Sequence, residues 1–278
     1  MAPENTGTQA LSRARVAIVT GAGRGIGRAM TLGLAQAGIR VVATSARERA
    51  EIDAVAAEAG TDRVLAVLAD ATREADAQRV VVTALERFGR VDILVNNAGR
   101  GMKYVRETFM TEPTRFWEVE PETWRMVIDT NVNGPFLMSR AATPHMVRAG
   151  WGRIVNISMN RSTMRRAGFS PYGPSKAALE SETAIWAQDL AGTGVTVNAL
   201  LPGGATLTGM IPDNFPVSAR RTLLDPRIMV PPLLWLVSEE TNAITGRRVT
   251  ANRWEHANPL AATESAGWGS DITPPPVS

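Results

Sequence analysis

Tyr172 and Lys176 have the residue types and the spacing that suit proton transfer to or from an alcohol oxygen. They lie four residues apart in Tyr172-Gly173-Pro174-Ser175-Lys176, so a helix that begins there places both side chains on one face. A free tyrosine has a pKa of about 10, and a neighbouring ammonium group is expected to stabilise the phenolate and lower that pKa. The pair also fits an amphipathic surface helix, but the chain has only two tyrosines. We therefore predict that Tyr172 is a general acid and base assisted by Lys176.

A glycine-rich segment directly follows the first predicted strand and begins a helix that runs towards Gly38. Its sequence is Thr20-Gly21-Ala22-Gly23-Arg24-Gly25-Ile26-Gly27. Glycines permit a tight turn and let backbone N–H groups approach a pyrophosphate closely. Glycine-rich turns also simply reverse chains, but the position of this one between a strand and a helix predicts dinucleotide binding.

The end of the second predicted strand favours NADP(H) over NAD(H). NAD sites of this kind place an acidic side chain there, whereas NADP sites omit it and supply a guanidinium group. Here Ser45 holds that position, Arg47 follows it, and Arg24 lies in the glycine-rich segment. Two arginines favour a 2′-phosphate. Both also fit ordinary surface positions, and Glu48 lies close by.

Seven short runs rich in β-branched residues alternate with six candidate helices and must position these groups. The runs are Val16 to Thr20, Arg40 to Thr44, Val64 to Leu68, Val91 to Val95, Arg153 to Ser158, Val195 to Leu201 and Arg247 to Ala251. Near-continuous apolar strands between helices predict an α/β fold, a single doubly wound Rossmann-type parallel sheet of about seven strands with helices on both faces. We expect one domain over 14–251, with a flexible N-terminal segment 1–13 and a C-terminal extension 252–278.

Three long connections interrupt this alternation, and connections of that kind are usually functional or disordered. Residues 100–121 and 206–226 are expected to wall the substrate pocket together with Met159, and the second of them to act as a lid. Both carry apolar residues and arginines, which fits a medium-sized substrate with a polar or acidic part. The proline-rich residues 252–278 are expected to reach a neighbouring subunit.

Composition excludes several other functions. The net charge of +3 comes from 30 basic and 27 acidic residues without any basic run, so we expect no nucleic-acid partner. Cysteine is absent, which excludes thiolate chemistry and disulfides. No signal-length or membrane-length apolar run occurs, so a cytoplasmic protein without membrane contact is expected. The two histidines, His145 and His256, lie far apart, and we predict no metal.

The order of these motifs resembles that of the short-chain dehydrogenase/reductase family over roughly residues 14–251. The resemblance is specific because several motifs occur in the expected order. They are the turn from Thr20 to Gly27, Asp70 after the third strand, Asn96-Asn97-Ala98-Gly99 after the fourth, Asn131 in the next helix, Ser158 at a strand end, Tyr172 with Lys176, and Pro202-Gly203 after the sixth strand.

The resemblance implies further cofactor contacts. Asp70 and Ala71 would meet the adenine, and Asn97, Ala98 and Gly99 would line the central cofactor path. Lys176 would bind the nicotinamide ribose beside Tyr172, and Pro202-Gly203 would border the nicotinamide. Thr208, or alternatively Thr206, would contact its carboxamide. Asp70 also fits a helix cap.

The resemblance also implies a proton relay and an assembly. Asn131 would hold a water molecule in a relay to Lys176, although it also fits a helix kink packed in the core. Family members are usually dimers or tetramers joined through the helices that bear Asn131 and Tyr172. We therefore expect a homodimer or homotetramer, to which Trp186 and Leu190 could contribute.

One position departs from the family pattern. The serine that binds the substrate oxygen usually lies thirteen residues before the tyrosine, and here that residue is Met159. Ser158 is the nearest hydroxyl, but strand alternation turns it to the other face unless the strand end bulges. Ser158 remains the favoured donor; Asn160 or Ser162 could replace it, or the contact could be weakened. The Met159 thioether would form an apolar wall for a substrate with a hydrophobic body.

These features together predict an NADP(H)-dependent oxidoreductase that interconverts an alcohol and a ketone or aldehyde by hydride transfer. Tyr172 would be its acid and base, assisted by Lys176, Asn131 and Ser158. Three alternatives share the scaffold: a catalytically weak dinucleotide-binding module, a reductase of an activated carbon–carbon double bond, and a dehalogenase of related fold. The dehalogenase reading is the weakest, because the cofactor turn and Lys176 are intact.

Overall fold

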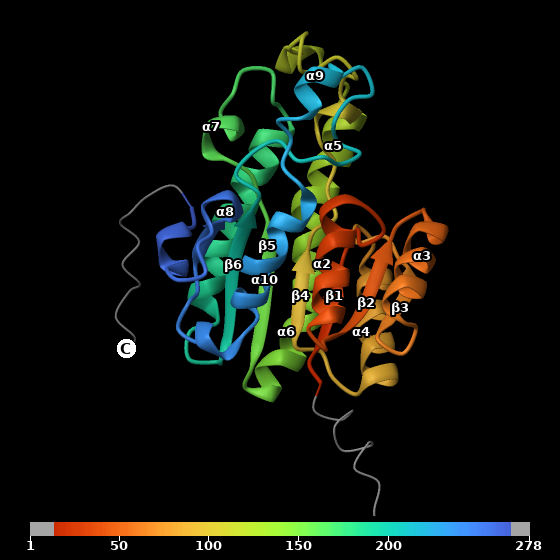
Figure 1. Cartoon of the computed structure of the whole chain (residues 1–278), viewed down its shortest axis with the longest axis vertical. Helices are drawn as coiled ribbons and strands as arrows, with labels where there is room; N and C mark the ends of the chain where they lie inside the picture. The colour runs from red at the N-terminus through yellow and green to blue at the C-terminus, as the bar shows by residue number, and fades with distance from the viewer. Residues whose placement is uncertain (1–13, 268–278) are drawn as a thin grey trace, which may run out of the picture.

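One sheet of eight strands forms the centre of the computed structural model, which describes residues 14–267, and its inner strands are short runs rich in Val, Ile, Leu and Ala (Figure 1). The strand order is β3-β2-β1-β4-β5-β6-β7-β8. The strands are β1 (Val16–Val19), β2 (Arg40–Ser45), β3 (Val64–Leu68), β4 (Ile93–Asn96), β5 (Gly152–Ile157), β6 (Val195–Leu201), β7 (Arg247–Thr250) and β8 (Thr263–Ser265). The first seven pair in parallel, as predicted for a doubly wound sheet.

Helices cover both faces of the sheet, so alternate residues of each central strand are buried on opposite sides (Figure 1). One face packs against α2 (Gly25–Gln36), α3 (Arg49–Ala59) and α10 (Val230–Leu236). The other packs against α4 (Glu74–Phe88), α6 (Gly134–Ala149) and α8 (Tyr172–Asp189). The predicted fold class is confirmed.

The last strand changes the expected extent of the sheet. β8 lies within the segment 252–278 that we expected to be an extension, and it pairs antiparallel with β7. Two short 3₁₀ helices, η6 (Ala251–Arg253) and η7 (Pro259–Ala262), lead into it. The sheet therefore includes part of that segment. The predicted flexible N-terminal segment 1–13 lies outside the described residues.

The long connections lie at the carboxyl ends of the parallel strands, at the top of Figure 1. They contain the short helices α7 (Arg161–Met164) and α9 (Val217–Arg220) and, before α6, helix α5 (Pro121–Ile128) with the π-helical turn η3 (Asp129–Asn133). The remaining 3₁₀ turns are η1 (Met102–Tyr104), η2 (Phe116–Glu118), η4 (Pro226–Met229) and η5 (Glu239–Thr241). Within residues 14–267, no helix has the length and apolar character needed to cross a membrane.

Candidate active site

One cavity of about 520 Å³ lies at the carboxyl ends of the strands and receives all but one of the predicted site residues. Asn131 is the exception, because it is fully buried behind the cavity wall. Parallel strands bring their carboxyl ends to one edge, which is where ligands bind in sheets of this kind. The predicted residues that line the cavity are Gly21, Gly23, Arg24, Gly25, Ile26, Gly27, Ser45, Arg47, Asp70, Ala71, Asn97, Ala98, Gly99, Ser158, Tyr172, Lys176, Pro202, Gly203 and Thr208.

The glycine-rich turn is too tight for side chains at several positions. Gly21 and Gly25 have φ values of 63° and 52°, in the left-handed region. A Cβ atom at Gly27 would lie 2.1 Å from the carbonyl oxygen of Gly21. The Asn97 Nδ2 atom closes the turn by donating to the carbonyl oxygens of Thr20 at 2.8 Å and Gly21 at 2.9 Å. Asn97 thus shapes the glycine-rich turn as well as lining the cavity.

The first turn of α2 is open to an anion. Arg24 precedes the helix and supplies no capping hydrogen bond from its side chain, so the first N–H groups of the helix keep their donor capacity. The missing side chains at Gly23 and Gly25 let Glu51 and Thr208 pack against the turn, since an added Cβ would lie 2.7 Å from Glu51 Cβ and 3.0 Å from Thr208 Cγ2. An uncapped helix N-terminus of this kind fits a pyrophosphate group.

The two arginines expected at the adenosine end have different surroundings. The Arg24 Nη1 atom lies 3.5 Å from Oε1 of Glu51, a cavity-lining carboxylate that the sequence analysis did not identify. Arg47 has no ion-pair partner among residues 14–267. Ser45 accepts a hydrogen bond from the backbone N–H of Glu48. Arg47 is therefore the less neutralised of the two guanidinium groups.

Asp70 and Thr208 are both held by local hydrogen bonds. Asp70 Oδ1 accepts from the backbone N–H and the hydroxyl of Thr72, which forms a turn beside α4. Thr208 lies against the glycine-rich turn, since a Cβ atom at Gly25 would be 3.0 Å from its Cγ2 atom. The alternative residue, Thr206, is buried and donates to Gly204 O at 3.2 Å. The connection after β6 therefore covers the turn with Thr208.

The Lys176 ammonium is tied to the end of β5. Its Nζ atom donates to Ile157 O at 2.7 Å, and Lys176 is 3% exposed. Asn131 Nδ2 donates to the hydroxyl of Ser175 and to Arg100 O, both at 2.9 Å, while its Oδ1 accepts from Arg100 N. Both amide hydrogens of Asn131 are thus committed. The side chain joins the π-helical turn to the start of α8.

The pKa of Tyr172 shifts in the direction opposite to our expectation. Burial raises the pKa of Tyr172 to about 12 because desolvation disfavours the phenolate. Burial also lowers the pKa of Lys176 to about 8 because desolvation disfavours the ammonium. Desolvation is the cause of both shifts, and the Tyr172 pKa does not show the lowering that we predicted from its neighbour.

Ser158 points away from the predicted oxyanion position. Its hydroxyl donates to Glu180 Oε1 at 2.7 Å, on the α8 side of the sheet. Strand alternation continues through the end of β5, and no bulge returns Ser158 to the other face. Met159 and Asn160 line the cavity, whereas Ser162 does not. Asn160 Nδ2 donates to Gly203 O at 3.0 Å.

Two buried charged residues beside the site escaped the sequence argument. Glu180 and Arg248 pair at 3.1 Å, and their side chains are 2% and 5% exposed. Glu180 follows Lys176 by one helical turn, so its position on the same face of α8 was a usable signal. Arg248 lies in β7, where it is buried although the neighbouring Arg247 is exposed. Its partners Glu180 and Met159 lie far away in the sequence, so no local pattern predicts that Arg248 is buried beside the site.

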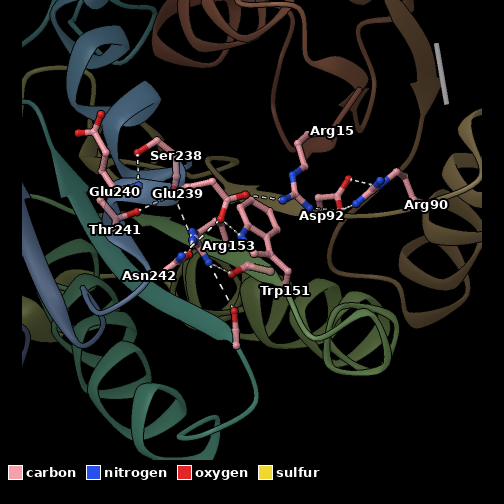
Figure 2. A network of polar contacts seen from close by, with 12 residues as sticks. Arg15, Arg90, Asp92, Trp151, Arg153, Ser238, Glu239, Glu240, Thr241 and Asn242 are labelled. Carbon is pink, nitrogen blue, oxygen red and sulfur yellow. Dashed lines mark hydrogen bonds and ion pairs between the residues drawn. The ribbon is translucent and has the colours of Figure 1, made fainter. Parts of the chain in front are cut away.

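A second network of buried charges lies at the opposite end of the sheet (Figure 2). The guanidinium of Arg153, at the start of β5, donates to Ser238 O at 3.1 Å and also to Asn242 Oδ1. Asp92 accepts from Arg90 and from the backbone N–H of Val16. Burial lowers the pKa of Arg153 to about 10. This network joins the amino ends of strands to η5, far from the cavity.

The described part of the chain holds no cluster of three His, Cys, Asp or Glu side chains that could bind a metal ion. The family model described as short chain dehydrogenase matches residues 15–216. A 3-oxoacyl-[acyl-carrier-protein] reductase of Synechocystis is 38% identical over 68% of this chain and 74% of its own length. The "short chain dehydrogenase citE" of Monascus ruber is 32% identical over 97% of this chain and 91% of its own.

A solved structure shares the fold. It is the 3-ketoacyl-(acyl-carrier-protein) reductase of Brucella melitensis complexed with NADH, with a TM-score of 0.73 and 34% identity, covering 84% of this chain and 95% of that one. The chain belongs to the short-chain dehydrogenase family and is an oxidoreductase of that family with an NAD(P)-binding Rossmann fold.

Proposed function

We propose that this protein interconverts an alcohol and a ketone or aldehyde by hydride transfer, with Tyr172 as the general acid and base. The observation that carries the proposal is the single cavity that contains both the glycine-rich turn and the Tyr172–Lys176 pair. A dinucleotide held at the turn and extending past Asn97 and Gly99 would end beside Tyr172, because all of these residues line the one cavity. A binding module without catalysis would have no use for a tyrosine and a buried lysine at that end.

The residues present fit NADP(H) as the bound group. The uncapped start of α2 and the glycine turn would hold the pyrophosphate, and Asp70 with Ala71 would border the adenine. Thr208 and the Pro202-Gly203 turn would border the nicotinamide. When bound, the nicotinamide supplies or accepts the hydride.

The protein's own side chains handle the proton. In the reductive direction Tyr172 donates its phenolic proton to the substrate oxygen, on which negative charge builds as hydride arrives. The Lys176 ammonium, held by Ile157 O, stabilises the phenolate that remains. Asn131 fixes the start of α8 through Ser175 and so orients Tyr172.

The preference for NADP(H) over NAD(H) rests mainly on Arg47. Glu51 partly neutralises Arg24, whereas the Arg47 guanidinium has no carboxylate partner among residues 14–267. Ser45 places no negative charge beside a 2′-phosphate. The site is therefore suited to a phosphate that Arg47 contacts.

The substrate part of the cavity is mainly apolar. Its walls include Met102, Phe109 and Met110 from the connection after β4, Phe169 before α8, and Met210 after β6. Phe109 and Phe169 pack edge to face with ring centroids 5.9 Å apart. We infer a ketone with a hydrophobic body. Because two relatives are named as 3-oxoacyl or 3-ketoacyl reductases, 3-oxoacyl thioesters belong on the test panel with aryl and alkyl ketones.

The decisive experiment follows NADPH oxidation at about 340 nm with this panel and compares the natural chain with Tyr172→Phe. We expect Tyr172→Phe to lose about 10²-fold or more in kcat while NADPH still binds, because the proton donor is removed and the cofactor site is kept. Turnover of no carbonyl compound by the natural chain, or full activity of Tyr172→Phe, would overturn the proposal.

A further inference from the structure

The end of β5 presents two neighbouring residues to opposite faces of the sheet. Ser158 donates its one hydroxyl hydrogen to Glu180, at 2.7 Å, on the side covered by α8. Met159 lines the cavity, and a thioether has no hydrogen to donate. A substrate oxygen that gains negative charge needs a donor. The Ser158 hydroxyl hydrogen is engaged by Glu180, and the Met159 side chain has no polar hydrogen to donate.

Arg248 holds this arrangement from the neighbouring part of the sheet. All three nitrogens of its guanidinium group are engaged. Nε donates to Glu180 Oε1 at 3.1 Å, Nη1 to Glu264 Oε2 at 3.4 Å, and Nη2 to Met159 O at 2.9 Å. The group therefore contacts both the acceptor of the Ser158 hydrogen and the backbone of Met159.

The last strand completes the network. Glu264 in β8 also accepts from Arg161 at 3.3 Å and from Arg253 at 3.3 Å. Arg161 begins α7, immediately after the segment that carries Met159 and Asn160. The backbone around Met159 is thus held on both sides by charged groups, one of which lies in the antiparallel strand beyond the family match.

We infer that Glu180 and Arg248 are positioning residues that hold the Ser158 hydroxyl away from the substrate oxygen and make Met159 the residue that determines carbonyl specificity. The inference rests on the proposed function. The substrate oxygen then receives a hydrogen bond from Tyr172 and none from Ser158. Such a site favours carbonyl groups that are already activated by electron-withdrawing substituents, because less stabilisation of the developing charge is required.

Two substitutions at the strand end test the inference directly, with NADPH and the probes acetophenone and trifluoroacetophenone. Ser158→Ala is expected to change kcat for trifluoroacetophenone by less than about threefold, since the hydroxyl makes no contact with substrate. Met159→Ser places a donor in the pocket and is expected to raise kcat/KM for acetophenone about tenfold or more. Met159→Ala, which enlarges the pocket without adding a donor, is the matched control and should not reproduce that gain.

The positioning role is tested with a matched pair of buried arginines. Arg248→Met and Arg153→Met each remove a buried guanidinium from the sheet, but only Arg248 contacts Met159. Both should lower the Tm. Only Arg248→Met should shift the ratio of kcat/KM for the two ketones, by about fivefold or more, because the pocket wall moves. Arg248→Lys, which keeps the charge, should restore part of the ratio.

The outcomes distinguish a failure of this inference from a failure of the proposed function. A loss of about 10²-fold in kcat for Ser158→Ala, comparable with that of Tyr172→Phe, would overturn the inference and leave the proposed function standing. An unchanged ketone ratio in Arg248→Met would overturn the positioning role. If that variant does not fold, the Ser158 and Met159 variants decide the inference. A natural chain that reduces no carbonyl compound would overturn the proposed function, and the inference with it.

Discussion

Burial moves the pKa values of Tyr172 and Lys176 toward the neutral form of each side chain. The pKa of Tyr172 rises to about 12, and that of Lys176 falls to about 8. Between these two values both groups are neutral in the folded protein. Tyr172 therefore keeps its proton across the physiological range, and the charge of Lys176 is the part of the pair that responds to pH.

The depressed pKa of Lys176 predicts that the folded protein gains stability as pH rises. Between its folded pKa of about 8 and its ordinary value of 10.5, the unfolded chain binds more protons than the folded chain. From pH 7 to pH 9.5 this group should add about 2 kcal/mol to the free energy of unfolding. The raised pKa of Tyr172 begins to act only above its ordinary value of 10.0.

Urea denaturation at the two pH values measures this effect, and Lys176→Met is the control. The variant should lack the gain of about 2 kcal/mol, while other titrating groups affect both proteins alike. An equal rise in the free energy of unfolding of the two proteins between these pH values would show that Lys176 is not the desolvated group.

The guanidinium of Arg47, which pairs with no carboxylate among residues 14–267, predicts a preference for NADPH over NADH. Removing it in Arg47→Ala should raise the KM for NADPH about tenfold and leave the KM for NADH nearly unchanged, because a charge-assisted contact to the 2′-phosphate is lost. Ser45→Asp should lower NADPH use further by repulsion. Steady-state kinetics with both cofactors checks this. Equal changes for the two cofactors would argue against a phosphate contact at Arg47.

Element geometry determines how closely a cofactor can approach. The strand-to-helix turn between β1 and α2 is closed by Asn97, and its glycines leave no room for side chains. The same geometry predicts that the turn is intolerant of a single added methyl group. At Gly27 the clashing atoms belong to the turn's own backbone and to the Asn97 side chain that closes it.

We predict that Gly27→Ala lowers the free energy of unfolding by about 1–3 kcal/mol and abolishes tight NADPH binding. The new Cβ would lie 2.1 Å from Gly21 O and 2.5 Å from Asn97 Nδ2. Gly209→Ala is the control, because its nearest heavy atom, Arg24 Nε, lies at 3.8 Å. Thermal melts and NADPH titration measure both effects. A stable Gly27→Ala protein with normal NADPH affinity would contradict the tight turn.

At the scale of the whole molecule, the face covered by α4, α6 and α8 carries exposed apolar side chains. Phe136 on α6 is 47% exposed and Ile185 on α8 is 52% exposed. Trp186 and Leu190, which we expected at an interface, are partly buried against the core of this face. The exposed pair makes α6 and α8 the surfaces on which we expect a second copy to pack.

Phe136→Glu with Ile185→Glu should therefore convert a dimer or tetramer into a smaller species. Desolvating two carboxylates at an interface costs more free energy than the apolar contact contributes. Light scattering after size-exclusion chromatography measures the mass. Val82→Glu on α4, at a site 49% exposed, is the control and should keep the natural mass. If the natural chain has the mass of a monomer, the expectation that α6 and α8 form an interface is wrong.

The sequence by itself determined the seven parallel strands, the edge of the sheet at which the cavity lies, and most of the cavity lining. Strand runs and glycine positions are local patterns, and a parallel sheet necessarily brings the following loops to one edge. The positions of Tyr172, Lys176 and Asn97 at one cavity followed from that rule. The departure at Met159 was also visible in the spacing alone.

Only the tertiary structure decided what the residues beside Tyr172 do. The partner of Ser158 is Glu180, and Glu180 is paired with Arg248, which reaches Met159 O and a carboxylate on β8. These contacts join segments separated by up to 89 positions, so no local pattern specifies them. The pKa values likewise depend on how fully Tyr172 and Lys176 are desolvated. Burial is a property of the packed molecule, and for Tyr172 it reversed the direction that charge proximity alone had predicted.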